Sequence, residues 1–196
     1  MKAILILMFL VLAPNLESNP WVLQTESKDI KAFARIKSGT DYYEFKTILN
    51  SNSSIEKLID LLMDVSSFKD WLPSTSDSRV LKRKSKEELI GYTVSTLPWP
   101  MSSRDLVFNM RLNRKNSNYA TITLTGIENY KVLNDNFVRV KNYKATWVIS
   151  KEGSKTSITH YVSFDPDSNV SKWMLKNSMI TARVDVLKAL KKELEK

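Results

Sequence analysis

The chain of 196 residues contains no cysteine and only one histidine, His160. The missing cysteine excludes disulfides, thiolate metal sites, a cysteine nucleophile and a lipid-modified cysteine anchor. A lone histidine cannot form a histidine metal site by itself. Glycine and proline are scarce, at 4 and 6 residues, which argues against a disordered or fibrous chain. With no GxSxG nucleophile elbow and no phosphate-binding loop, the sequence predicts neither a cofactor nor a bound metal.

Acidic residues are outnumbered by basic ones, 21 to 30, which gives a formal net charge of +9. A basic balance of this kind suits nucleic acid or the anionic head groups of a membrane. The lysines are spread along the chain rather than gathered in one arm. We therefore expect a solvated basic surface that makes transient membrane contact and has no nucleic-acid partner.

A single long apolar run lies at the N-terminus, from Ala3 to Ala13, directly after Lys2. Its length suits the hydrophobic region of a secretory signal and is short for a membrane span. We expect residues 1–18 to be a signal peptide that exports the protein to the periplasm or the exterior, and residues 19–196 to form one domain. The alternative is an uncleaved segment that anchors the protein to a membrane.

Several segments alternate apolar and polar residues, which is the pattern of half-buried strands. These segments are 30–36, 43–49, 79–84, 89–97, 104–113, 119–126, 137–150 and 156–164. Residues 55–63 instead repeat apolar side chains at helical spacing, after a capping-box pattern of Ser53 and Glu56. A long amphipathic pattern runs from Trp173 to Leu194, and Asn177 falls within its apolar stripe, where it would need a polar partner.

The order of two strands, a helix, a run of strands and a long final helix predicts an α+β fold, because strands and helices do not alternate one for one. We expect a strongly curved antiparallel sheet wrapped around the C-terminal helix. Such an arrangement can enclose a cavity between the sheet and the helix.

The most informative segment is 97–108, which reads LPWPMSSRDLVF. Alternation along the strand that begins at Arg104 places Leu106, Phe108 and Met110 on the same face as the guanidinium. A buried arginine needs a partner or a polar ligand. This segment is therefore the first candidate for a functional site.

The same segment resembles the Pro-Trp-Pro and Ser-Arg-Asp-Phe signature of the START domain, the steroidogenic-acute-regulatory-protein-related lipid transfer family. Residues 68–73, 156–165 and 170–175 resemble three further segments of that family in the same order. The resemblance implies a helix-grip fold with a hydrophobic tunnel for one lipid. It also implies that the tunnel opens when the C-terminal helix and a neighbouring loop shift.

The resemblance also implies a role for Arg104. In sterol-binding members of the family, the arginine at this position lies in the tunnel and pairs with a carboxylate on the preceding strand. The corresponding position in this chain falls at about Gly91, and Glu88 lies three residues away. Since the carboxylate is missing, we expect Arg104 to hold a polar group other than a sterol hydroxyl.

The candidate ligand-binding residues comprise two polar side chains, Arg104 and His160, which would orient the polar end of a ligand. The remaining candidates would line the cavity or its gate: Phe108, Met110, Trp147, Phe164, Trp173, Asn177 and Ile180. Strand parity turns His160 inward. Each of these residues also has a structural interpretation, as an arginine bonded within the fold, a satisfied core histidine, or a plain core side chain.

These observations predict a monomeric, non-enzymatic protein that binds a lipid or another hydrophobic small molecule in an internal tunnel. It would transfer that molecule between membranes or carriers. The alternative is an enzyme of the cyclase or hydrolase type that uses the same cavity, with His160 as acid–base and Arg104 stabilising an oxyanion. A third possibility is a module that binds protein or nucleic acid through the basic surface.

Overall fold

The structure is a computed structural model that describes residues 19–97, 102–131, 136–165 and 172–196, with the side chains of 172–174 also outside the description. The predicted signal peptide, residues 1–18, lies outside the described residues. So do residues 98–101 of the LPWPMSSRDLVF segment.

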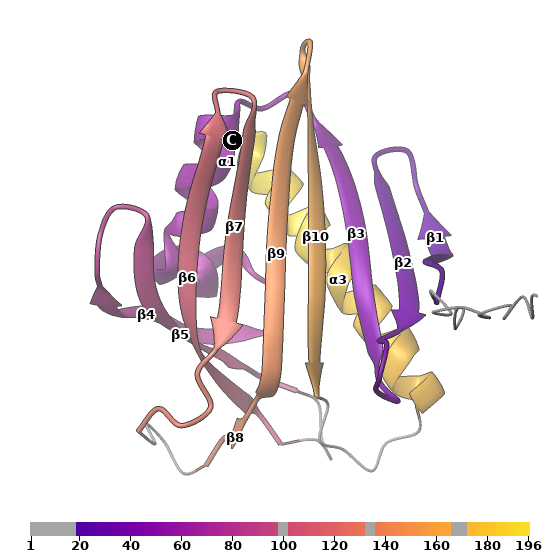
Figure 1. Ribbon diagram of the computed structural model, residues 1–196, viewed down its shortest axis with the longest axis vertical. Helices are drawn as coiled ribbons and strands as arrows, with labels where there is room; N and C mark the ends of the chain where they lie inside the picture. Colours follow the sequence, from indigo (N-terminus) through magenta and orange to yellow (C-terminus); the bar gives the residue numbers. More distant parts are fainter. Residues whose placement is uncertain (1–18, 98–101, 132–135, 166–171) are drawn as a thin grey trace, which may run out of the picture.

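A single curved sheet holds all the strands of the described residues (Figure 1). Its strands follow the order β1-β2-β3-β10-β9-β7-β6-β5-β4, all antiparallel, and the short β8 pairs in parallel with β6. The bounds are β1 Val22–Glu26, β2 Ile30–Ile36, β3 Tyr43–Ser51, β4 Thr75–Arg83, β5 Glu88–Ser95, β6 Arg104–Asn116, β7 Tyr119–Gly126, β8 Val138–Arg139, β9 Lys141–Glu152 and β10 Lys155–Asp165. The predicted antiparallel sheet is confirmed.

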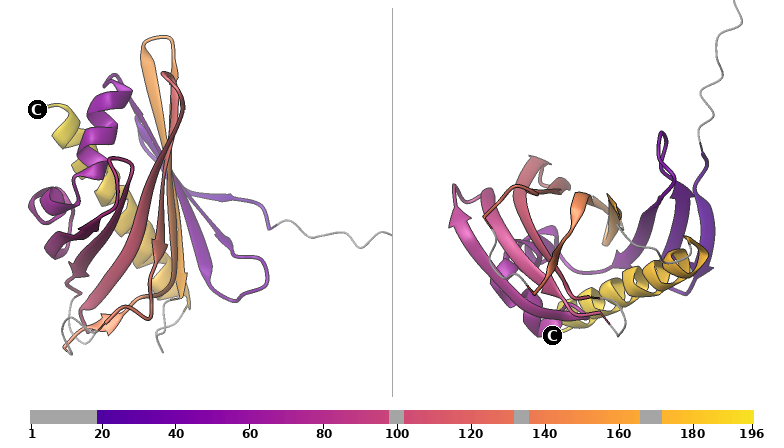
Figure 2. Two further views of the ribbon diagram at one scale, coloured as in Figure 1. Left: turned by 60° about the vertical axis from the view of Figure 1, so that its left-hand side comes forward. Right: turned by 90° about the horizontal axis from the view of Figure 1, so that it is seen from below.

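All the helices of the described residues lie on the concave face of this sheet (Figure 2). They are α1 Ile55–Met63, the 3₁₀ turn η1 Val65–Ser67, α2 Phe68–Trp71 and α3 Lys172–Leu194. The view from below shows the sheet curving around α3, which confirms the predicted helix-grip arrangement. None of the helices in the described part of the chain combines the length and apolar composition that a membrane span requires.

Helix α1 begins where a serine hydroxyl satisfies one of its free backbone N–H groups. Ser54 accepts a hydrogen bond from the backbone N–H of Lys57 at 3.2 Å. The predicted capping box of Ser53 and Glu56 is therefore displaced by one residue. Since a lysine stands three residues after the true cap, no glutamate can complete the box, and the cap is one-sided.

Inner and outer faces of the sheet follow the alternation in the sequence. On β6, Phe108, Met110 and Leu112 are buried in the main core with the apolar faces of α1 and α3. Val107 points to the opposite face and is nevertheless fully buried. There it forms a second, smaller core with Tyr92 and Val94, against which Ile127, Tyr130 and Phe137 pack. This outer core covers one end of the sheet, whereas the cavity described below lies on the inner face.

Helix α3 buries the predicted apolar stripe through Ile180, Leu187, Leu190 and Leu194. The expectation that Asn177 lies within that stripe is wrong, because its side chain is exposed. Asn177 precedes Leu187 by ten residues, which places it about 80° around the helix at 3.6 residues per turn. This rotation moves its side chain off the buried face.

Candidate functional site

A cavity of about 550 Å³ lies between the inner face of the sheet, the segment around α2 and helix α3. Strands β5, β6, β7, β9 and β10 all contribute lining residues, and α3 closes the opposite side. The lining is mostly apolar and aromatic, with a few polar groups. Ligand pockets in proteins have this size and character, at about 300–1,000 Å³.

Five of the nine predicted ligand-binding residues line this cavity. They are Arg104, Phe108, Trp147, His160 and Phe164. Alternation brings them to one face, and the curvature of the sheet brings three strands, β6, β9 and β10, together around the same space.

The other four predictions fall elsewhere. Met110 and Ile180 are buried in the main core and do not line this cavity. Asn177 is exposed on α3, as described above, so its predicted place in the binding wall is wrong. The side chain of Trp173 lies outside the described residues.

His160 occupies the centre of a row of inward-facing residues that crosses the sheet. Thr47 lies opposite it on β3 and Trp147 opposite it on β9. The imidazole stacks on the Trp147 ring with centroids 3.8 Å apart and planes 5° from parallel. Only 3% of His160 is exposed, and its Nδ1 has no hydrogen-bond partner in the described residues.

The protonation state of His160 follows from this environment. Burial lowers the pKa of His160 well below its ordinary value, and the positive charge of Arg183 lowers it further. Both effects disfavour the imidazolium. The ring is therefore neutral at neutral pH, and it presents a nitrogen without a partner beside the cavity.

Arg183 is the residue that the sequence analysis missed. It projects from α3 into the cavity lining, and its Nε is buried without a hydrogen-bond partner among the described residues. Burial lowers the pKa of its guanidinium, against a smaller opposing effect of Tyr143. The signal was present in the sequence as a second apolar stripe on α3 that flanks Arg183: Leu175, Met179, Ala182 and Val186.

Tyr143 and Trp71 add two further polar groups to the cavity wall. Burial raises the pKa of the Tyr143 hydroxyl, which stays protonated and stacks against Phe164 with ring centroids 6.5 Å apart. The indole Nε1 of Trp71 is buried without a partner in the described residues. Buried polar groups are nearly always hydrogen-bonded. Trp71, His160 and Arg183 thus bring three nitrogens without partners among the described residues to the cavity wall.

Arg104 stands at the end of β6 opposite Ser95, half-buried at the rim of the same cavity. The position at which a carboxylate was sought, Gly91, pairs with Phe108 four residues further along. A Cβ atom at Gly91 would lie 2.5 Å from the Phe108 ring, so no larger side chain fits there. Glu88 faces outward and pairs with Lys84 and Arg111. Neither Gly91 nor Glu88 supplies a counter-charge for Arg104.

A family profile described as the START domain matches residues 6–196 of this chain. The chain belongs to the START domain family. Among curated relatives, the phosphatidylcholine transfer protein of Rattus norvegicus is 25% identical over 186 residues, which cover 90% of this chain and 86% of the relative. The family membership confirms the resemblance read from the four sequence segments.

Solved structures of START-related proteins share the fold. A STAR-related lipid transfer protein from Xanthomonas axonopodis superposes with a TM-score of 0.82 at 23% identity, covering 90% of this chain and 99% of the other. The Zhui aromatase/cyclase of Streptomyces superposes with a TM-score of 0.57 at 13% identity, covering 78% and 93%. The helix-grip scaffold thus occurs both in proteins named for lipid transfer and in one named as an enzyme.

The described residues contain no group of three or more histidine, cysteine, aspartate or glutamate side chains that could hold a metal ion.

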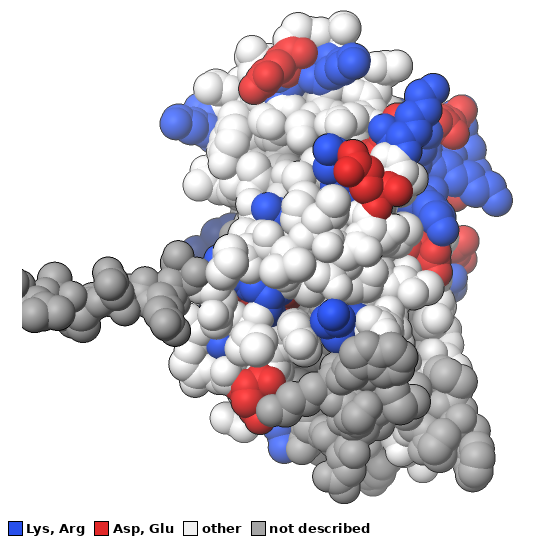
Figure 3. Space-filling model, turned by 90° about the vertical axis from the view of Figure 1, so that its right-hand side faces the viewer, with Lys and Arg blue, Asp and Glu red and all other residues white. Residues whose placement is uncertain are grey.

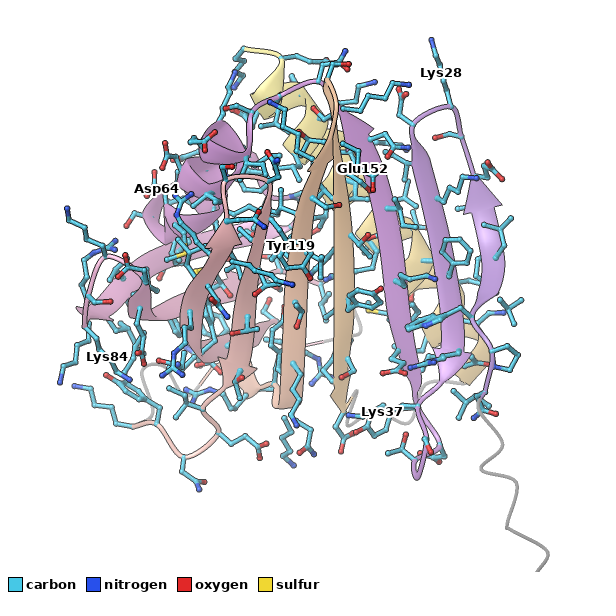
Figure 4. All side chains as sticks on the ribbon, turned by 45° about the horizontal axis from the view of Figure 1, so that its top comes forward. Lys28, Lys37, Asp64, Lys84, Tyr119 and Glu152 are labelled. Carbon is cyan, nitrogen blue, oxygen red and sulfur yellow. The ribbon has the colours of Figure 1, made fainter. Side chains whose placement is uncertain are left out.

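Acidic and basic side chains are interspersed over the face that the β1 edge of the sheet presents (Figure 3). Ion pairs such as Arg35 with Glu44 at 2.6 Å and Lys191 with Asp29 at 2.6 Å account for part of this pattern. Lys28 and Lys37 lie at opposite ends of β2, far from one another (Figure 4). Over this part of the surface, the positive charge is distributed rather than concentrated.

Proposed function

We propose that this START-family protein binds one lipid-like molecule in the cavity beneath its curved sheet and carries it between membranes or other carriers. The observation that supports this most is the cavity itself. It is about 550 Å³, lined mainly by apolar and aromatic side chains, and it has a few polar nitrogens without partners on its wall. Such a space suits an apolar body with one polar end.

The energy of binding would come from the apolar body. Each methylene group removed from water contributes about 0.8 kcal/mol. The aromatic wall of Phe108, Trp147 and Phe164 offers the ligand an extended apolar contact surface. The polar groups then determine the orientation of the ligand in the cavity.

Carriage between membranes is the second half of the proposal. The name of the rat relative refers to transfer of phosphatidylcholine, and that of the Xanthomonas relative to lipid transfer. A carrier must release its ligand at a membrane, so part of the wall has to move. We propose that α3 shifts for this purpose and that the basic surface favours transient contact with an anionic leaflet.

The direct test is to purify the protein, extract it with organic solvent and identify the extract by mass spectrometry. Transfer of fluorescent lipids from donor to acceptor vesicles measures carriage. Ala182 lines the cavity on α3, so Ala182→Phe should fill part of it and reduce both lipid uptake and transfer. The matched change Lys192→Phe on an exposed part of the same helix should leave both unchanged. An extract without lipid and no uptake of any lipid would contradict the proposal.

An enzyme in the same cavity is the second candidate, and one observation favours it. His160 is buried and neutral, and the charge of Arg183 acts on it, which is an arrangement suited to proton transfer beside a stabilised oxyanion. In this case His160→Ala would abolish turnover of a cyclisable or hydrolysable substrate while binding persists. Binding of such a substrate by the wild-type protein without any turnover would favour the carrier.

Export belongs to the proposal as well. The apolar run Ala3–Ala13 after Lys2 supports a secretory signal in residues 1–18. Fractionation of cells followed by N-terminal sequencing of the protein tests it. A mature N-terminus near residue 18 would support export. A full-length chain in the membrane fraction would support the uncleaved anchor.

A further inference from the structure

We infer that the ligand of this cavity carries a negatively charged head group, a carboxylate or a phosphate, which binds against Arg183. This inference rests on the proposed lipid-binding function and specifies the chemical class of the ligand. It starts from a half-buried arginine whose Nε is fully buried and has no partner in the described part of the protein.

Arg183 lacks a counter-ion among the described residues. It forms no hydrogen bond or ion pair with them, and its Nε is buried without a partner. Within the part of the chain that the structure describes, the Tyr143 hydroxyl is the one group whose charge favours the protonated form of Arg183. That hydroxyl is neutral at physiological pH because burial raises its pKa. A guanidinium in such surroundings is costly unless it meets an anion.

One carboxylate borders the cavity within the described residues, and it is already engaged. Asp185 pairs with Lys188 at 3.1 Å, and its side chain is 43% exposed. Within the described residues no carboxylate is left to pair with Arg183, so we assign that role to the ligand.

Neighbouring groups favour the same chemistry. His160 and Trp71 each present an unpartnered ring nitrogen in residues that line the cavity, and the indole nitrogen is solely a donor. Arg104 adds a second positive charge at the rim. Donors and positive charges without a competing carboxylate match an oxyanion, because carboxylate and phosphate oxygens are acceptors only and pair well with guanidinium.

A ligand with a net positive head group fits poorly. Although Trp147, Tyr143 and Phe164 could offer aromatic faces to a cation, the field of Arg183 already disfavours positive charge at His160. A neutral head group would leave the guanidinium without a counter-charge. The arrangement therefore selects an acidic amphiphile over its neutral analogue.

The experiment compares three single-chain probes of equal chain length: palmitic acid, monopalmitoyl phosphate and methyl palmitate. Each displaces the uncharged dye Nile red from the full-length protein at pH 7.4, below the aggregation concentration of the probe. We expect at least one acidic probe to bind ten-fold or more tightly than the methyl ester. The stronger of the two acids then tells whether the site prefers a carboxylate or a phosphate.

Substitution of the arginine tests its role directly. Arg183→Met should lower the affinity for the acid at least ten-fold. The affinity for the ester should stay the same or rise. Arg183→Lys, which keeps the charge, should retain most of the preference. Lys192→Met is the matched control, because it removes the same charge from an exposed part of the same helix.

The outcomes separate this inference from the proposed function. Equal binding of acid and ester by the wild-type protein, or an undiminished preference for acid in Arg183→Met, would overturn the inference while lipid binding stands. If none of the three probes displaces the dye and organic extraction recovers no lipid, the proposed function itself fails. The wild-type comparison needs no variant, so it remains decisive even if a variant does not fold.

Discussion

Two arginines in this protein are shielded from solvent on opposite faces of the same sheet, and their surroundings differ. Arg139 lies on the outer face and donates from Nε and Nη2 to the two carboxylate oxygens of Asp105, both at 2.8 Å. Its Nη1 donates to backbone carbonyls of the segment that covers the outer core. Arg183 lies on the inner face, beside the cavity, and has no such partner among the described residues.

The difference distinguishes Arg139, which stabilises the fold, from Arg183, for which we propose a role in binding. Asp105 is 2% exposed, and its hydrogen bonds raise the pKa of Arg139, so this pair is locked within the fold. Burial lowers the pKa of Arg183, and no hydrogen-bonded carboxylate among the described residues offsets this effect. A satisfied buried arginine holds two segments together, whereas an unsatisfied one beside a cavity is available to a ligand.

Breaking the outer pair should have the largest effect. Asp105→Ala leaves the Arg139 guanidinium buried without its carboxylate, and we expect the free energy of unfolding to fall by about 3–5 kcal/mol. Urea denaturation followed by circular dichroism measures it. The double variant Asp105→Leu with Arg139→Met, which removes both charges, should recover most of the loss. A single variant that unfolds at the wild-type urea concentration would mean that the pair does not stabilise the fold.

Crowding the cavity wall should come next. At Gly91 an added Cβ would meet the Phe108 ring at 2.5 Å, so Gly91→Ala has to displace that ring. Overpacking of this kind costs about 1–3 kcal/mol. Thermal unfolding measures the loss, and Phe108→Leu in the same chain should relieve part of it. Additive effects of the two substitutions would show that they do not meet across the strands.

The single histidine makes the inner face sensitive to acid. Because the folded pKa of His160 is lowered, the unfolded chain binds more protons, and stability rises with pH. The contribution is complete above the unfolded pKa of about 6.5 and is lost as pH falls below it, with a slope of up to about 1.4 kcal/mol per pH unit.

Urea denaturation between pH 7.5 and 5 isolates this effect. The lowered pKa values of Asp29 and Glu88 make both carboxylates titrate below this range. His160→Gln should flatten the profile over that interval. If the glutamine variant loses stability as steeply as the wild type, the buried neutral histidine is not the cause.

The smallest effect on stability is expected at the cavity arginine itself. Arg183→Met removes an uncompensated charge and keeps an unbranched side chain, so the free energy of unfolding should change by less than about 1 kcal/mol or rise. Arg139→Met leaves the buried Asp105 carboxylate without its partner, so the free energy of unfolding should instead fall by about 3–5 kcal/mol. The two are compared by urea denaturation without added lipid. Equal losses at both positions would remove the distinction between them.

Much of the fold followed from local patterns. The strand segments 30–36, 104–113 and 156–164 correspond to β2, β6 and β10, and the final helix ends where its apolar stripe does. Strand β1 was not predicted, because apolar and polar residues do not alternate along it. The structure gives the reason, since Val22 and Leu23 are exposed at the edge of the sheet. The outer core was also missed, since Val107 lies on the side of β6 opposite Phe108 and is nevertheless buried.

The strand residues of the candidate site were predicted better than its helix residues. Strand alternation is a local property, so it placed Arg104, Phe108 and His160 on the inner face correctly. A helix offers no such two-way choice. Whether Asn177, Ile180 or Arg183 meets the cavity depends on how α3 is rotated about its axis and how it crosses the sheet.

Side-chain parity within the strands, the approximate place of most elements and membership of the START domain family could be read from the order of residues, because these depend on patterns within short segments. The depth of each charge could not. Arg104 lies at the rim of the cavity, whereas Arg183 lies within it. The curvature of the sheet and the packing of α3 against the sheet determine how far each guanidinium is from water. The segment LPWPMSSRDLVF carries the family signature, whereas Arg183, which we propose to bind an anionic head group, lies on α3 against the inner face of the sheet.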